Sequence, residues 1–170
     1  ERTHRNVGAE PAKMVGQPGP VGGLAGRGFA RISAGVHAGD GDHGGEQGGV
    51  LPGWRRSFCL RQWRFRGSPD YPGLMMSLDL GGQCQGVLFE LPDRDLETQF
   101  HKLFRREFTI KPNTNIPRWL TVETDAGPVA ALVFVMNRES PQYAGNLSPE
   151  DVADVLAQSC GHLGTGAEYL

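Results

Sequence analysis

The clearest hydrophobic pattern in the chain lies within residues 93–108. Leu96, Phe100, Leu103 and Phe104 recur at helical spacing and form one apolar stripe. Acidic residues come early in this segment and basic residues come late, an order that complements the helix dipole. The pattern therefore predicts one amphipathic helix whose stripe packs against the rest of the fold.

Runs of strand-forming residues predict strands on both sides of this helix. Three strands are expected before it, at residues 54–63, 74–80 and 83–91, and two after it, at residues 119–123 and 129–136. The last of these is apolar on both faces, so we expect a central strand there. This order is not a regular alternation of strand and helix. It predicts an α+β fold with a small mixed β-barrel or sheet and flanking helices.

A second helix is expected to begin after Ser148. Ser148 is a favourable N-cap residue, and Pro149 suits the first helical position. The residues expected to face the core are Val152, Val155 and Leu156. In the first helix we expect Phe100, Leu103 and Phe104 to be buried, together with Val133 and Phe134.

The composition changes sharply near residue 50. Residues 1–50 hold 14 of the 25 glycines and one aromatic residue, Phe29. A segment with so little apolar bulk cannot offset the entropy lost when it becomes ordered. We therefore expect residues 1–49 to be a glycine-rich tail, disordered or non-native, and residues 50–170 to be the folded domain. Translation from a wrong reading frame is one explanation for such a tail.

Length, charge and cysteine content exclude several classes of function. The chain of 170 residues suits one domain, and its net charge of -2 gives no reason to expect a nucleic acid or an anionic membrane as partner. No apolar run approaches the length of about 18 residues that a membrane span needs. The three cysteines are widely spaced, which predicts reduced thiols in a cytoplasmic protein and no zinc cluster.

Two weak motifs lie in the glycine-rich tail. His37, Asp40, Asp42 and His43 are metal-ligand types, but such residues in a flexible glycine-rich loop are usually solvated. The glycines of residues 22–28 match neither the phosphate-loop spacing nor the dinucleotide-binding spacing. We therefore expect no metal and no cofactor.

Glu107 is the first candidate for chemistry. It falls on the apolar stripe of the predicted helix, where burial and the negative end of the helix dipole would both raise its pKa. A glutamate tuned in this way suits a general base. The alternative is a structural ion pair with Arg105, Arg106 or another cation. The pattern alone leaves both interpretations open.

Five segments, taken together in their order and spacing, resemble the ChaC-type γ-glutamylcyclotransferases. They are GWRRSFCL (53–60), RGSPDYPGL (66–74), LFRRE (103–107), YAGNL (143–147) and GTGAEYL (164–170). The resemblance covers about residues 50–170. It implies the fold of that family, a small mixed β-barrel with flanking helices.

The resemblance also implies an activity and a set of site residues. Members of the family cleave glutathione to 5-oxoproline and cysteinylglycine, by attack of the γ-glutamyl α-amine on its own side-chain amide. Glu107 matches the family's general base, which also returns a proton to the leaving group. Tyr143 matches a tyrosine that holds the glutamyl end, with a purely structural loop anchor as the alternative. Gly53 and Trp54 are the further residues expected at the substrate. No cofactor or metal is implied.

The chain departs from the family pattern in two places. The family's Y-G-S-L motif, which lines the glutamyl pocket, has no match in residues 1–50, and its long C-terminal helix has none after residue 170. We therefore expect a domain incomplete at both ends, with reduced activity and stability. Two alternatives to glutathione cleavage stay open: a non-catalytic binding protein of the same fold, and a cyclotransferase for other γ-glutamyl amines. The oligomeric state is left open.

Overall fold

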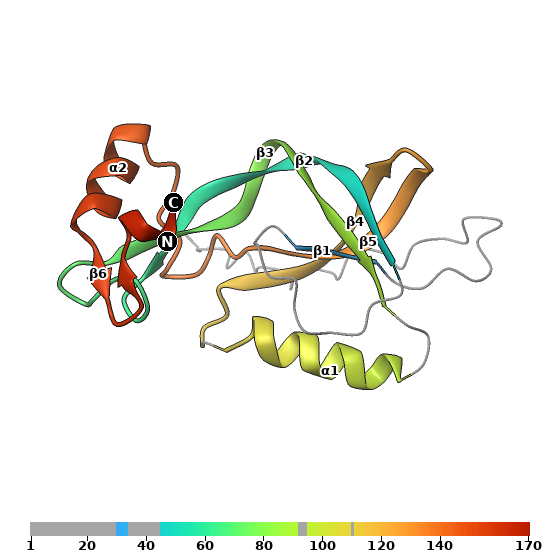
Figure 1. Cartoon of the computed structure of the whole chain (residues 1–170), viewed down its shortest axis with the longest axis horizontal. Helices are drawn as coiled ribbons and strands as arrows, with labels where there is room; N and C mark the ends of the chain where they lie inside the picture. The colour runs from blue at the N-terminus through green and yellow to red at the C-terminus, as the bar shows by residue number, and fades with distance from the viewer. Residues whose placement is uncertain (1–29, 34–44, 92–94, 110) are drawn as a thin grey trace, which may run out of the picture.

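The computed structural model describes residues 30–33, 45–91, 95–109 and 111–170. Figure 1 shows a curved sheet with one helix, α1, along one face and a second, α2, at one end. The elements, in order, are β1 (Ala30–Ser33), β2 (Gly45–Gln62), β3 (Gly73–Glu90), α1 (Leu96–Glu107), β4 (Asn115–Thr124), β5 (Gly127–Met136), α2 (Pro149–Gln158), β6 (Cys160–Gly161), β7 (Gly164–Thr165) and a 3-10 turn, η1 (Ala167–Tyr169).

The sheet is mixed and barrel-like. Two antiparallel hairpins, β2–β3 and β4–β5, form most of it. β1 lies between them, antiparallel to β3 and parallel to β5. The pairing order β1-β3-β2-β4-β5 returns to β1, although β2 meets β4 only at Val50 and Glu123. This mixed sheet with flanking helices confirms the α+β fold predicted from the sequence.

The hydrophobic core lies inside the curve of the sheet. β5 occupies the central position between β4 and β1, and Ala131, Leu132 and Val133 are all buried there. This confirms the prediction that the strand apolar on both faces is central. The core cluster comprises Leu51, Leu78, Cys84, Leu88, Val122, Ala131, Val133 and Val135.

Two glycines allow the chain to reverse between β2 and β3. A Cβ at Gly67 would collide with the backbone of Gly73, and a Cβ at Gly73 would collide with the carbonyl of Arg66. Only glycine permits backbones to approach this closely. The backbone at the start of the connection between β2 and β3 therefore lies directly against the backbone at its end.

The strands are longer than the sequence pattern indicates. The strands predicted at residues 74–80 and 83–91 are one strand, β3, which continues through Gly81 and Gly82 with φ of 105° and 63°. The pairing with β2 shifts register at this glycine step and continues on both sides of it, at Leu80 and at Gln83. β4 likewise begins at Asn115, before the strand predicted at residues 119–123, because its pairing with β5 starts at Asn115 and Met136.

Part of the predicted tail is extended chain in the sheet. Residues 30–33 form β1 and residues 45–49 form the start of β2, so the boundary predicted at residue 50 falls within a strand. Both segments pair with β3 through backbone hydrogen bonds, and β1 also pairs with β5. No apolar period marked them, because β1 has only four residues and the start of β2 is rich in glycine. The possible metal ligands His37, Asp40, Asp42 and His43, and the glycines of residues 22–28, lie outside the described residues.

α1 lies within the segment predicted to be helical, and α2 begins where the sequence predicts. In α1 the N–H of Phe108 donates to the carbonyl of Phe104 at 2.9 Å and closes the last turn. In α2 the hydroxyl of Ser148 accepts from the N–H of Asp151 at 3.1 Å, which confirms the predicted N-cap. Among the described residues, no helix is both long and apolar enough to cross a membrane.

Candidate active site

Glu107 is the last residue of α1, and aromatic rings anchor that end of the helix. The rings of Phe104 and Phe108 each lie 5.8 Å from the ring of Phe134 on β5, in edge-to-face arrangements. The Glu107 side chain is 19% exposed, and its Oε1 lies 3.6 Å from Nε of Arg106. A carboxylate in this position is shielded from most bulk water. The ion pair foreseen with Arg106 is present, and it does not exclude a role in chemistry.

The remainder of the apolar stripe on α1 is less buried than predicted. Leu103 and Val133 are buried, at 7% and 0% exposed, but Phe100, Phe104 and Phe134 are only half-buried. The prediction that these five residues are buried together is therefore wrong for the three phenylalanines. They contact each other at ring edges and leave open space on the helix surface.

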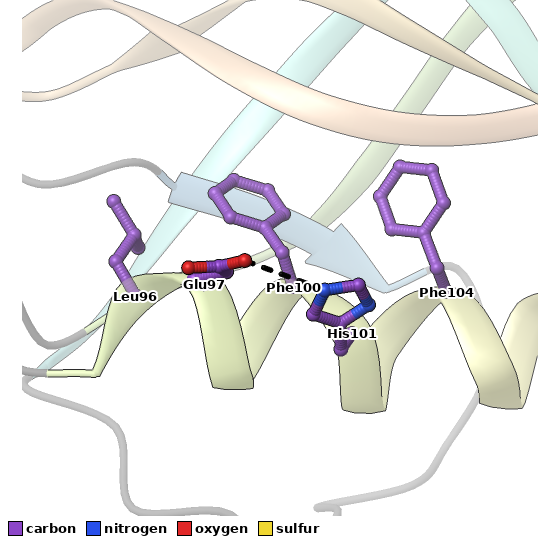
Figure 2. Close-up of a pocket in the computed structure, with 5 residues that line it drawn as sticks. All are labelled: Leu96, Glu97, Phe100, His101 and Phe104. Atoms are coloured by element: carbon purple, nitrogen blue, oxygen red, sulfur yellow. Dashed lines mark ion pairs between the residues drawn. The ribbon is translucent and has the colours of Figure 1, made fainter.

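That open space is a groove of about 490 Å³ along the first turns of α1. Figure 2 shows the rings of Phe100 and Phe104 directed toward the sheet, and Glu97 beside His101. Oε1 of Glu97 lies 3.7 Å from Nε2 of His101. The lining residues are Leu96, Glu97, Phe100, His101 and Phe104. The groove therefore ends before Glu107 and is apolar apart from one exposed pair.

Tyr143 lies in the segment between β5 and α2, which is fixed to β2 by backbone hydrogen bonds. Tyr143 forms an isolated antiparallel bridge with Leu60. The N–H of Ala144 donates to the carbonyl of Cys59 at 2.8 Å, and the N–H of Arg61 donates to the carbonyl of Gln142 at 2.8 Å. The side chains join as well, since Nη2 of Arg55 donates to Oδ1 of Asn146 at 2.7 Å. The structure thus brings GWRRSFCL and YAGNL together.

Gly53 and Trp54 start the same stretch of β2. Gly53 is exposed with φ of 79°, at a register shift between Pro52 and Trp54, and a Cβ there would meet no neighbour. Its backbone conformation, rather than lack of space, favours glycine. Trp54 is half-buried and packs against the hydrophobic core. Trp54 therefore supports the fold, and its contact with a substrate stays a prediction.

The second and fifth motifs also meet. Nη1 of Arg66 donates to the carbonyl of Thr165 at 2.9 Å and lies 3.7 Å from Oε2 of Glu168. The N–H of Leu163 donates to the carbonyl of Phe65 at 2.9 Å. In Figure 1 these segments gather at the α2 end of the sheet, and the C-terminal end of α1 is the end nearer to them.

Asp79 on β3 is the most unusual side chain in this region, because it is a carboxylate only 1% exposed. Nε of Arg138 donates to its Oδ1 at 2.7 Å, and Nη2 donates to its Oδ2 at 3.1 Å. The hydroxyl of Tyr143 donates to the same Oδ2 at 3.0 Å. The guanidinium carbon of Arg138 lies 5.4 Å from the centre of the Tyr143 ring. A predicted site residue is therefore held by two residues that the sequence did not single out.

The environment of this cluster lowers the pKa of Asp79 and raises the pKa of Tyr143 and of Cys59. Burial alone would raise the pKa of Asp79, but hydrogen bonds from Arg138, the Leu80 N–H and Tyr143 outweigh it and lower that pKa. Burial, then the hydrogen bond to Asp79 and its negative charge, raise the pKa of Tyr143. Burial and the charge of Asp79 raise the pKa of Cys59 to about 11. At neutral pH, Asp79 is charged, and Tyr143 and Cys59 are protonated.

Sequence analysis missed Asp79 and Arg138, although a signal was present. Asp79 stands between Leu78 and Leu80 in a predicted strand, and Arg138 follows two residues after the apolar strand ends. An acid within an apolar strand must be paired if it is buried, and a nearby arginine is the usual partner. Which arginine it is depends on the fold, since Asp79 and Arg138 are distant in sequence.

We also searched the described residues for side chains that could bind a metal ion. No group of three or more His, Cys, Asp or Glu side chains within them is arranged to hold a metal ion. The three cysteines, Cys59, Cys84 and Cys160, are free thiols, two of them buried.

Comparisons with known proteins agree on one family. Residues 38–170 match the family model described as ChaC-like protein. A glutathione-specific γ-glutamylcyclotransferase of Escherichia coli K12 is 37% identical over 123 residues, which cover 72% of this chain and 52% of that protein. Glutathione-specific γ-glutamylcyclotransferase 1 of Danio rerio is 30% identical over 129 residues, which cover 72% of this chain and 64% of that protein. The chain thus spans between half and two thirds of the length of these relatives.

A solved structure supports the fold. The crystal structure of a glutathione-specific γ-glutamyl cyclotransferase from yeast matches with a TM-score of 0.69 and 15% identity, over 85% of this chain and 84% of that one. At this identity the likeness shows a shared fold.

Proposed function

The chain belongs to the ChaC-like protein family, and from that premise we propose that it is a γ-glutamylcyclotransferase acting on glutathione. The family match over residues 38–170 carries this proposal. The two curated relatives, which share 37% and 30% identity with the chain, are both named as glutathione-specific enzymes.

The reaction needs no water and no second substrate. The α-amine of the γ-glutamyl group attacks the carbonyl carbon of its own side-chain amide, so a C–N bond forms within a five-membered ring. The amide C–N bond to cysteine then breaks. The α-ammonium gives up two protons in total, and the departing amine gains two, so the products are 5-oxoproline and cysteinylglycine. Because the reaction is intramolecular, the protein must hold a folded substrate and move protons.

We assign the proton transfers to Glu107. Its carboxylate can take a proton from the α-ammonium and deliver it to the leaving nitrogen. The limited exposure of its side chain, 19%, supports this role, because a base that serves repeated transfers benefits from shielding from bulk water. Its position on a regular helix whose end is fixed by Phe104 and Phe108 also supports the role.

Tyr143 is proposed to hold the glutamyl end of the substrate, with Gly53 and Trp54 nearby on β2. The hydrogen bonds that pin the Tyr143 segment to β2 support a rigid site in this region. No cofactor or metal is required by the reaction. We place the protein in the cytoplasm, since its three free cysteines suit a reducing compartment and glutathione is a small soluble substrate.

Direct assay tests this function. The full chain is incubated with glutathione, and 5-oxoproline and cysteinylglycine are quantified together, with Glu107→Gln as the matched variant. Equal amounts of both products from the unchanged chain, and none from the variant, are expected. Binding of glutathione without turnover would show a non-catalytic protein of the same fold. Turnover of γ-glutamylalanine but not of glutathione would show a cyclotransferase for other γ-glutamyl amines.

A further inference from the structure

Asp79, Arg138 and Tyr143 form a closed triangle of side chains between β3 and the segment after β5. Arg138 and Tyr143 both donate to the Asp79 carboxylate, at 2.7 to 3.1 Å. The Arg138 guanidinium also lies over the Tyr143 ring. Each side chain contacts the other two, so the orientation of each depends on both of its partners.

The single proton of the Tyr143 hydroxyl determines whether this group can donate a hydrogen bond to a ligand or only accept one. A phenol has one proton to donate and lone pairs that accept. In Tyr143 that proton points to Oδ2 of Asp79, a buried carboxylate that stays charged and has no proton of its own to give. What remains on the phenol oxygen is acceptor capacity alone.

We propose that Asp79 is a positioning residue that makes the Tyr143 hydroxyl an acceptor for the α-ammonium group of a γ-glutamyl substrate. This assignment rests on the glutathione cleavage proposed above, and it states which part of the glutamyl end Tyr143 holds. That end carries an ammonium, which donates hydrogen bonds, and a carboxylate, which requires donors. While the Tyr143 hydroxyl donates its hydrogen bond to Asp79, its oxygen suits the ammonium and not the carboxylate.

Arg138 completes the arrangement by balancing the charge of Asp79. Its planar guanidinium makes a two-pronged contact with the carboxylate, a geometry that lysine cannot reproduce. The backbone around Tyr143 is held at Ala144 and Gln142 by bonds to β2. The nearby titratable group on β2 is Cys59, which burial keeps protonated. The phenol oxygen is thus preorganised before a substrate arrives.

Tyrosine labelling tests the contact without reference to activity. The full chain is prepared with ¹³C at Cζ of its three tyrosines, and the Tyr143 signal is identified by its loss in Tyr143→Phe. The signal is then titrated with pH. In Asp79→Asn the pKa of Tyr143 is expected to fall, because the negative charge and its hydrogen bond both raise that pKa in the parent. An unchanged pKa in Asp79→Asn would overturn the positioning role.

Kinetics with glutathione test the consequence for the substrate. Tyr143→Phe and Asp79→Asn are each expected to raise KM by about tenfold or more, the effect of losing one hydrogen bond to a charged group, with kcat changed less than about threefold. The double variant should be no worse than either single variant, because both remove the same contact. A fall in kcat at unchanged KM, or additive effects, would show a merely structural cluster. Asp154→Asn, an exposed acid on α2, is the matched control.

Two further outcomes separate this inference from the proposed function. If Asp79→Asn does not fold, Arg138→Lys replaces it in the kinetic measurement, because it loosens the carboxylate without removing it, and an unchanged KM would overturn the positioning role. If the parent chain yields no 5-oxoproline, the proposed cleavage is wrong, while the titration still judges the contact between Asp79 and Tyr143. Addition of glutathione to the labelled parent then decides the ligand contact, and an unmoved Tyr143 signal would refute it.

Discussion

Replacement of Asp79 by asparagine should destabilise the fold strongly for a change of so few atoms. The Asp79 carboxylate is 1% exposed and accepts two hydrogen bonds from Arg138 and one from Tyr143. Asparagine keeps one acceptor oxygen and turns an NH₂ group toward donors. Loss of one partner of a buried pair costs about 3–5 kcal/mol in typical proteins.

The expected cost here is lower because the partner can reach water. The Arg138 side chain is 45% exposed, so solvent can rehydrate it once the carboxylate has gone. We therefore expect Asp79→Asn to lower the free energy of unfolding by about 2–4 kcal/mol at pH 7, from which a fall in Tm of about 5–15 °C follows. Urea denaturation followed by circular dichroism measures the first quantity, and a thermal scan measures the second.

The pH dependence of the stability difference between the parent and Asp79→Asn provides a second, independent test. Because the pKa of Asp79 is lowered in the folded state, its charge contributes stability that is fully present above the ordinary carboxyl pKa of about 3.9. That contribution is lost as the pH falls through the lower pKa of the folded state. The gap between parent and variant should therefore be wide at pH 7 and pH 5 and should narrow toward pH 3.

A matched surface change serves as control. Asp154→Asn, on the exposed side of α2, should alter stability by less than about 0.5 kcal/mol at each pH. A loss below about 1 kcal/mol in Asp79→Asn, or a gap that stays constant between pH 7 and pH 3, would refute the account of a buried, charged and fully bonded carboxylate.

Three other predictions follow from the same structure. Glu107→Gln should lower the rate of 5-oxoproline formation by at least about 100-fold while Tm stays unchanged; more than a tenth of the parent rate would remove Glu107 from the chemistry. Phe104→Ala should cost about 1–3 kcal/mol in urea denaturation, less than the 3–5 kcal/mol typical of a fully buried phenylalanine, because the ring is half-buried. A chromogenic thiol reagent at pH 8 should label Cys160 quickly, since it is exposed, and Cys59 only after unfolding, since burial raises its pKa to about 11. Rapid labelling that persists in Cys160→Ser would contradict the buried state of Cys59 and Cys84.

Local sequence patterns predicted the helices and strands that are determined by residues close together in the chain. The stripe on α1, the cap at Ser148 and the apolar run of β5 each depend on neighbours a few residues away, and each is found where it was expected. Pattern did not find β1, which has only four residues, or the glycine-rich start of β2, because backbone pairing with β3 holds both. Backbone hydrogen bonds of this kind do not depend on a pattern of side chains, so the sequence gives no signal for them.

The candidate site also contains residues that the sequence identified and features that depend on the fold. Glu107 stood out in sequence, as an acid on an apolar stripe and through resemblance to a family, and Tyr143 stood out through that resemblance alone. The half-exposure of Phe100 was not predictable, since the width of the space beside α1 depends on how the helix meets the sheet.

Only the tertiary structure joined Asp79 to Arg138 and Tyr143. Each of the three residues was visible in the sequence, but separations of 59 and 64 residues hide the contacts of Asp79. The hairpin of β2 and β3 carries Asp79 to the segment after β5, and burial there makes pairing obligatory for a charged carboxylate. The order of residues alone shows that an acid lies within an apolar strand. The folded chain decided which cation balances it and which tyrosine hydroxyl donates a hydrogen bond to it, because a hydrogen bond depends on distance in space and not on distance along the chain.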